Sequence, residues 1–197
     1  NFSVNADTFF ISGGRFVVRP GAKLSGLSVT ESLEPVYRFI AENSGNSSVS
    51  LGRLSFNVRL GGLALTGGGV PGDFELRQVV NGWEASSLEW QASSVTGNVV
   101  RFDTLGDLRL PRGTQAEYVL KARLSELGVV SENDSVSAQI LSDTSLQVGA
   151  LSSVRASGAN FIWSDHSGRP HTLSSEDWIS GYLIPGLPTN SVVNYRR

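Results

Sequence analysis

Apolar and polar residues alternate with a period of two along most of the chain, which is typical of strands that bury one face. The clearest run alternates five apolar residues with mostly charged ones: Ala116, Tyr118, Leu120, Ala122 and Leu124. Glycine and serine recur every few residues, and the apolar spacing of three or four that marks an amphipathic helix is rare. The pattern predicts an all-β fold.

Two breaks in the alternation predict how the strands are shaped and joined. Val49 and Leu51 lie in one phase, and the apolar residues from Leu54 to Leu60 lie in the other, so we predict a β-bulge between them, at Gly52 and Arg53. Strand patterns flank Asn81 and Gly82, a pair that accepts the positive φ angles of a two-residue hairpin turn. A second hairpin is predicted at 96–98, and residues 61–72 are predicted to form a long glycine-rich loop.

Length and composition set limits on the fold and its partners. A chain of 197 residues with 40% apolar content can form one large sandwich or two small halves, and the absence of cysteine excludes disulfides and thiolate metal sites. A net charge of −2 with 17% charged residues provides no field for nucleic acid or an anionic membrane. No apolar run approaches the roughly 20 residues of a membrane helix, so no membrane span is expected.

The sequence also contains no methionine and begins at Asn1. We interpret this as the product of signal-peptide removal, which predicts an extracellular or cell-surface location. The lack of both sulfur-containing residues removes the side chains most easily oxidised and is weak support for the same location.

Three stretches carry a further signal: residues 36–41 followed by 49–56, residues 110–124, and a closing module at 160–188 that contains Phe-Ile-Trp-Ser-Asp and Pro-Gly-Leu. These stretches resemble exported surface proteins of small environmental bacteria, often of candidate phyla. The resemblance implies an immunoglobulin-like β-sandwich, with a jelly roll as the variant, and it transfers no common activity. His166 stands where that module usually has asparagine. We expect residues 1–13 to form an N-terminal strand, 14–157 the sandwich and 158–197 a closing segment packed on it.

Few residues are candidates for chemistry. His166 and His171 are the only histidines, and with Asp165 they could meet a metal ion, but the polar turn between them and the charge of Arg169 favour a surface loop. The pairs Asp103/Asp107 and Glu132/Asp134 follow no calcium-loop pattern, and no Gly-x-Ser-x-Gly motif occurs. We therefore expect no cofactor, no metal and no enzymatic activity.

Four tryptophans, at 83, 90, 163 and 178, are the remaining large features. Exposed aromatic rings stack well on sugars, but the apolar neighbours of these residues favour core packing. Asn1, Asn46 and Asn133 each begin an Asn-x-Ser triplet that permits glycosylation, although chance accounts for such triplets in a serine-rich chain.

The N-terminal segment suggests a function. It has a strand pattern followed by Ser-Gly-Gly, and strand addition to a neighbouring copy would bury its apolar side chains. The expected donor residues are Phe2, Val4, Ala6, Phe9, Phe10 and Ile11. We predict a structural subunit of an extracellular filament or surface layer, assembled as a homopolymer by strand exchange; a monomeric surface adhesin or carbohydrate-binding module with a glycan partner is the alternative. Pairing of this segment within its own domain also stays open, and so does exchange of the C-terminal segment.

Overall fold

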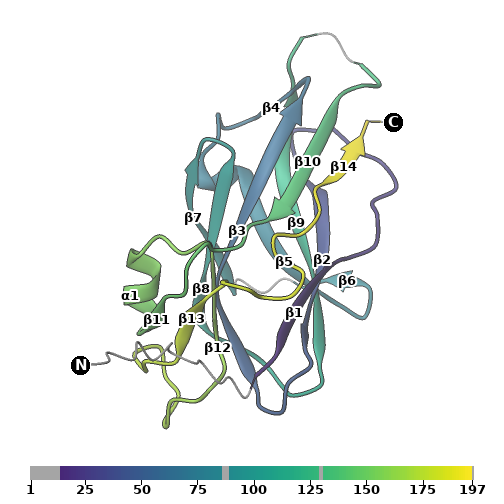
Figure 1. Ribbon diagram of the computed structural model, residues 1–197. Helices are drawn as coiled ribbons and strands as arrows, with labels where there is room; N and C mark the ends of the chain where they lie inside the picture. Colours follow the sequence, from purple (N-terminus) through teal and green to yellow (C-terminus); the bar gives the residue numbers. More distant parts are fainter. Residues whose placement is uncertain (1–13, 86–88, 129–130, 197) are drawn as a thin grey trace, which may run out of the picture.

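The computed structural model describes residues 14–85, 89–128 and 131–196, and within them the chain is an all-β sandwich of two antiparallel sheets (Figure 1). The prediction of the fold class is confirmed. The expected donor residues, from Phe2 to Ile11, lie outside the described part of the chain.

The first sheet is ordered β1, β2, β9, β5, β6, and a short strand, β4, pairs with β9. Its strands are β1 (Phe16–Pro20), β2 (Leu33–Asn43), β4 (Leu63–Leu65), β5 (Phe74–Val80), β6 (Trp83–Glu84) and β9 (Gln115–Glu126). The alternation noted in β9 is confirmed, because all five of its apolar positions are buried.

The second sheet is ordered β11, β13, β12, β3, β10, β14, with β8 on β3 and β7 on β8. Its strands are β3 (Val49–Gly61), β7 (Trp90–Thr96), β8 (Val99–Leu110), β10 (Ser135–Ile140), β11 (Val148–Gly149), β12 (Phe161–Ser164), β13 (Trp178–Ser180) and β14 (Val192–Tyr195). Residues 158–197, expected as a closing segment, therefore contribute three strands to this sheet.

Strand β3 organises the second sheet. One edge of β3 pairs with β8, and the other edge is shared, with β12 bonded to its first half and β10 to its second half. The register with β8 shifts between Leu51 and Arg53, so the predicted bulge is confirmed. Because the bulge restores the phase, both halves of β3 face the core.

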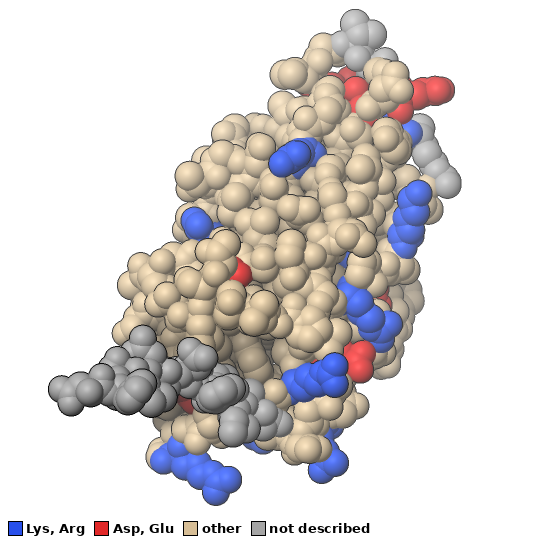
Figure 2. All heavy atoms as spheres, in the orientation of Figure 1, with Lys and Arg blue, Asp and Glu red and all other residues tan. Residues whose placement is uncertain are grey.

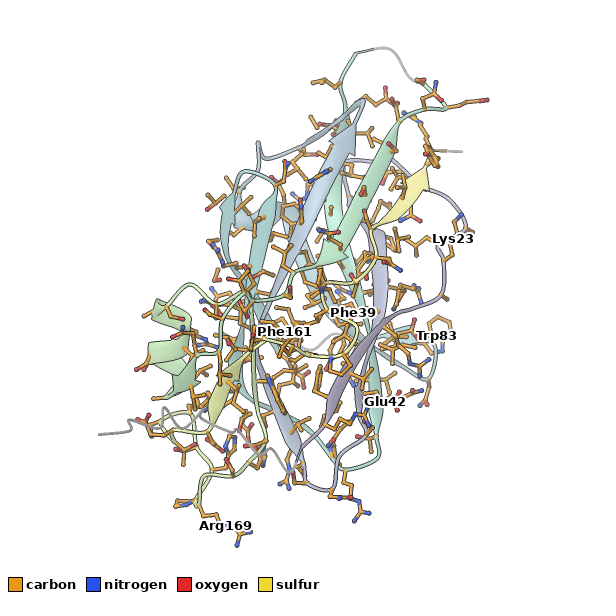
Figure 3. The ribbon with its side chains drawn as sticks, viewed as in Figure 1. Lys23, Phe39, Glu42, Trp83, Phe161 and Arg169 are labelled. Atoms are coloured by element: carbon orange, nitrogen blue, oxygen red, sulfur yellow. The ribbon has the colours of Figure 1, made fainter. Side chains whose placement is uncertain are left out.

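Aromatic rings from both sheets fill the interior. Phe39 of β2 lies 5.2 Å from Tyr118 of β9 and 5.7 Å from Phe56 of β3, measured between ring centroids. Phe56 in turn meets Phe102 of β8 edge to face at 5.8 Å. Figure 3 shows Phe39 and Phe161 inside the molecule. The pairs join the two sheets by apolar burial and favourable ring geometry.

Local predictions for the turns are confirmed at two sites. Asn81 and Gly82, with φ of 52° and 82°, connect β5 to β6, and Gly97, with φ of 58°, lies in the turn between β7 and β8. The prediction of a loop over 61–72 is wrong for Leu63–Leu65, which form β4 on the edge of β9. Tertiary pairing there outweighs the local glycine content.

Two short helices occur in the described part of the chain: a 3-10 turn at Pro71–Asp73 and α1 at Leu151–Ala156. The sequence pattern does not predict α1. Leu151 and Val154, one helical turn apart, pack with Ile162 and Trp178 in a small second core. Gly158, with φ of 84°, follows the helix and provides the conformation that ends it.

Candidate functional site

Strand β14 forms one edge of the second sheet. The backbone carbonyl of Tyr195 accepts the N–H of Leu27, on the side away from β10, whereas the N–H of Arg196 donates back to Asp134. In an antiparallel ladder the N–H and C=O of one residue point to the same side, and alternate residues share a side. The backbone groups of Val193 therefore face outward, as those of Tyr195 do.

A groove runs along this outer edge. Its walls are Lys23 to Gly26 on one side and Val193 to Arg196 on the other, and its volume is about 330 Å³. An adjoining groove of about 230 Å³ is lined by Leu24, Tyr37 and Val192 among others. Residues 20–27 lie across the groove from β14. Among the described residues, these two segments share one backbone hydrogen bond, from the N–H of Leu27 to the carbonyl of Tyr195. Within residues 14–85, 89–128 and 131–196, no backbone group pairs with the outward side of Val193.

The C-terminal residues considered for exchange, Val192, Val193 and Tyr195, already pair with β10 of the same chain. In the described fold they complete their own sheet. They lie in the edge strand of the sheet, with 57% of Tyr195 and 36% of Val193 exposed.

The tryptophans divide into two groups. Trp90, Trp163 and Trp178 are buried, which confirms core packing for these three, whereas Trp83 is 80% exposed. Trp83 follows the β5–β6 turn and lies at the periphery in Figure 3, next to Val80, which is 47% exposed. Trp83 is therefore the tryptophan that is available to a flat ligand.

Charged side chains are spread over the surface. Figure 2 shows lysine and arginine side chains scattered over the visible face, without a continuous basic patch. None of the helices in the described part of the chain has the length and apolar character needed to cross a bilayer.

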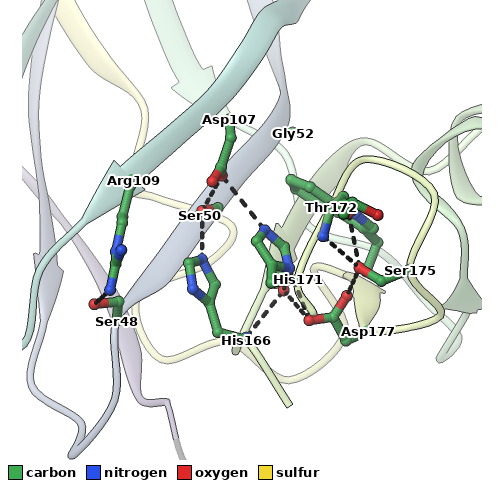
Figure 4. Close-up of polar contacts among 12 residues, drawn as sticks. Ser48, Ser50, Gly52, Asp107, Arg109, His166, His171, Thr172, Ser175 and Asp177 are labelled. Atoms are coloured by element: carbon green, nitrogen blue, oxygen red, sulfur yellow. Dashed lines mark hydrogen bonds and ion pairs between the residues drawn. The ribbon is translucent and has the colours of Figure 1, made fainter. Parts of the chain in front are cut away.

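A polar cluster lies at the junction of β3, β8 and the loop between β12 and β13 (Figure 4). We call it the histidine cluster, and it consists of six residues: Ser50, Asp107, Ser164, His166, His171 and Asp177. The rings of His166 and His171 stack with centroids 3.8 Å apart and planes 15° apart. The sequence pattern predicts a surface loop for these histidines, but the fold turns both of them inward onto β3 and β8.

Asp177 fixes His171 in place. Its carboxylate Oδ2 lies 2.8 Å from Nδ1 of His171 and also accepts the hydroxyl of Ser164 at 3.0 Å and the N–H of Gly168 at 3.1 Å. Ser175 donates to the other oxygen. Burial acts to raise the pKa of Asp177, but these hydrogen bonds outweigh it and lower the pKa. Asp177 is therefore a buried carboxylate that orients the His171 ring.

On the far side of the ring, Nε2 of His171 faces Oδ1 of Asp107 at 3.4 Å. The same carboxylate oxygen accepts the hydroxyl of Ser50, and Oγ of Ser50 lies 2.6 Å from Nε2 of His166. Burial lowers the pKa of His166, and the adjacent His171 lowers it further. The cluster is a continuous path of polar contacts from Asp177 to His166.

The backbone contributes to this arrangement at His166. Its φ of 58° lies in the left-handed region, which is uncommon for residues other than glycine, although asparagine, aspartate and histidine adopt it more often than the rest. Its N–H donates to Ser164 Oγ at 3.0 Å. The strained conformation directs the His166 ring toward Ser50 and His171, as Figure 4 shows.

The contacts do not form a nucleophilic triad. In such a triad the acid bonds to the histidine nitrogen that is not in contact with the serine, whereas here Asp107 bonds to Ser50 itself. Ser50 is also fully buried, so no substrate carbonyl reaches its hydroxyl. Three side chains of the cluster can instead hold a cation: Asp107, His166 and His171 have ligand atoms that all lie within 4.8 Å of one another.

The other carboxylates considered in the sequence have different partners. Asp165 is buried and its Oδ1 accepts the N–H of Ser167, so it is not part of the ligand group with the two histidines. Asp103 pairs with Arg53 and Arg155, away from Asp107. Asp134 is buried and bonds to Ser131 and Arg196. Asp107 is the residue that the sequence did not connect with the histidines, because it lies on β8, 64 residues before His171.

Comparisons with known protein families and with curated protein sequences find no match for this chain.

Proposed function

We propose that the chain is a structural subunit of an extracellular filament or surface layer, in which a strand from one copy adds to the open edge of β14 in the next. The observation that carries the proposal is the outward-facing backbone of Val193 beside a groove. A strand laid along this edge would satisfy the free backbone groups and extend the second sheet. The donor in this proposal is the segment from Phe2 to Ile11, whose apolar residues suit the pocket beside Leu24 and Tyr37.

The chemistry of the described surface supports a non-catalytic role. The histidine cluster lacks the connectivity of a triad, and the buried Ser50 hydroxyl is closed to substrates. The side chains at the β14 edge are mostly apolar or neutral, as suits an interface.

The decisive variant is Val193→Pro. Proline removes one backbone N–H, and at this position that N–H faces outward, so the bonds between β14 and β10 remain. We expect the wild-type chain to form assemblies that negative-stain electron microscopy and light scattering detect. Val193→Pro should remain monomeric, and so should a chain without residues 1–11.

Val193→Thr is the matched control, because it keeps the N–H and the β-branched shape. It should assemble as the wild type does. Assembly that survives both Val193→Pro and the deletion would overturn the proposal, and so would a wild type that stays monomeric at high concentration.

Trp83 favours a second candidate function, a carbohydrate-binding module. The ring is 80% exposed, and β6 also carries Glu84, which pairs with Lys121 at 2.7 Å. An aromatic platform beside polar groups is the usual arrangement for stacking on a sugar. Glycan-array binding that Trp83→Ala abolishes would support this function, and equal binding by both proteins, or none, would exclude it at this site.

A further inference from the structure

The histidine cluster contains a pair of facing atoms that both act as acceptors. Nδ1 of His171 bonds to Asp177, a carboxylate that can only accept, so Nδ1 carries the proton of the ring. In the neutral ring Nε2 then presents a lone pair, and this lone pair faces the Asp107 carboxylate at 3.4 Å. Two acceptors at this distance repel each other unless a proton or a metal cation lies between them.

We propose that the cation is a divalent transition-metal ion of the zinc type, held by Asp107 Oδ1, His166 Nε2 and His171 Nε2. This site goes beyond the assembly proposal and involves none of the residues at the β14 edge. Two imidazoles and one carboxylate match the ligands that zinc prefers, whereas calcium and magnesium select oxygen ligands.

The distances fit such an ion. Ligands about 2.1 Å from zinc at the tetrahedral angle lie about 3.4 Å apart, and the Asp107 and His171 atoms are 3.4 Å apart. A ring nitrogen of His166 lies within 4.8 Å of ligand atoms of both other residues, and Nε2 is the nitrogen that contacts Ser50, whose hydroxyl donates to Asp107 Oδ1. In the structure Nε2 of His166 lies 2.6 Å from Oγ of Ser50. To bind the ion, the His166 ring would rotate so that Nε2 leaves this hydroxyl and faces the metal.

The surroundings have the features of a built site. Asp177 accepts from Nδ1 of His171, which is the carboxylate–histidine–metal arrangement that fixes the tautomer and makes Nε2 a better ligand. The side chains of His171 and Asp177 are 9% and 2% exposed, and that of Asp107 is 41% exposed. The ion thus has a rigid support on one side and access from solvent on the other, where water completes the coordination.

The proposed ion would join parts of the chain that are distant in sequence. Asp107 belongs to β8, and both histidines belong to the loop between β12 and β13. Binding would therefore fasten this loop to the sheet and raise the melting temperature, because the ligand stabilises the folded state by mass action.

The test is zinc titration of untagged protein by calorimetry, with three variants. We expect one Zn²⁺ per wild-type chain. Asp107→Asn and His166→Asn should each weaken binding by more than the roughly 10-fold that loss of a supporting carboxylate costs. His166→Asn retains the left-handed backbone, because asparagine tolerates this region, and Asp107 is exposed, so both variants should fold.

Glu176→Gln is the matched control, since Glu176 is an exposed carboxylate of the same loop outside the ligand set. It should bind Zn²⁺ as the wild type does, and Ca²⁺ should bind to none of the proteins. The chain has two histidines, so their imidazole ¹⁵N resonances provide a second readout. Zinc should shift Nε2 of both rings.

The proposal is overturned if stoichiometric zinc leaves the ¹⁵N resonances of both imidazole rings unchanged. A proton alone would then account for the contact between His171 and Asp107. It is also overturned if Zn²⁺ binds to His166→Asn and Asp107→Asn as strongly as to Glu176→Gln.

Discussion

Nδ1 of His171 lies 2.8 Å from Oδ2 of Asp177, a carboxylate that the fold has almost completely removed from solvent. This contact connects the loop between β12 and β13 to the interior. Asp177 also accepts hydrogen bonds from Ser164, Ser175 and Gly168, so a single side chain organises most of the polar groups of the loop.

Asp177→Asn should therefore destabilise the protein. The asparagine amide has one accepting oxygen, whereas the carboxylate has two. Its NH₂ group would face some of the hydrogen-bond donors that Asp177 accepts from, and these donors would lose their acceptor. We expect the free energy of unfolding to fall by about 3 kcal/mol, measured by urea denaturation. Glu176→Gln, one residue away and exposed, should change it by less than about 0.5 kcal/mol. Equal stability of the two variants would contradict the assigned role of Asp177.

The ring of Phe56 is expected to be a main determinant of core stability. It is fully buried and contacts the rings of Tyr37, Phe39 and Phe102. Phe56→Ala should lower the free energy of unfolding by about 3–5 kcal/mol, because it removes apolar contacts and leaves a cavity. Leu105→Ala, at a position 61% exposed, is the control and should have little effect. A small loss for Phe56→Ala would mean that the sheets repack without it.

Gly186 is expected to be irreplaceable for a steric reason. A Cβ atom at this position would lie 1.8 Å from the carbonyl oxygen of Val18, and φ is 89°. Gly186→Ala should lower the free energy of unfolding by at least about 2 kcal/mol, from backbone strain and the clash together. Gly72→Ala, where a Cβ meets nothing within 4 Å, is the matched control. Equal melting temperatures for the two variants would contradict the close approach of the backbone at Gly186 to Val18 of β1.

Asp103 should contribute to the pH dependence of stability. Burial acts to raise its pKa, but hydrogen bonds from Arg53 and Ser93 and the charges of Arg53 and Arg155 outweigh burial, so the pKa is lowered. Because the pKa is lowered, the stabilisation that the Asp103 carboxylate provides is complete above the pKa of an aspartate in the unfolded chain, about 3.9. It is lost as pH falls toward the lower pKa of the folded state.

The corresponding variant is Asp103→Asn, compared with wild type between pH 2 and pH 6 by urea denaturation. The slope of stability against pH in the acid range should decrease by up to about 1.4 kcal/mol per pH unit. Glu132→Gln, at an exposed position, should leave the slope unchanged. An unaltered slope in Asp103→Asn would mean that its carboxylate has the same pKa in both states.

Much of the fold can be predicted from the sequence because it depends on local patterns. The alternation in 116–124 identifies a strand with one buried face, and the phase slip at Gly52 and Arg53 identifies the bulge. Asn81 and Gly82 identify their hairpin because few other dipeptides accept both φ angles. These signals lie within a few residues of the structure that they specify.

The histidine cluster was harder to predict because its parts meet only through tertiary structure. Asp107 lies in a strand, and nothing near it in sequence distinguishes it from a solvated position. Asp165, next to His166, was the nearer candidate, yet it is buried with its Oδ1 bonded to Ser167. The strand β4 was missed for the same reason, since its pairing with β9 outweighs the surrounding glycines.

The shared edge of β3 has a consequence for how the chain folds during synthesis. Its first half pairs with β12 and its second half with β10, and both partners come from later in the sequence. The first half of this edge therefore stays unpaired until residues 161–164 have been made. Such distant pairings slow folding and leave a strand edge exposed to other chains. A ribosome-bound fragment that ends before residue 161 should therefore associate with other chains more readily than the finished protein.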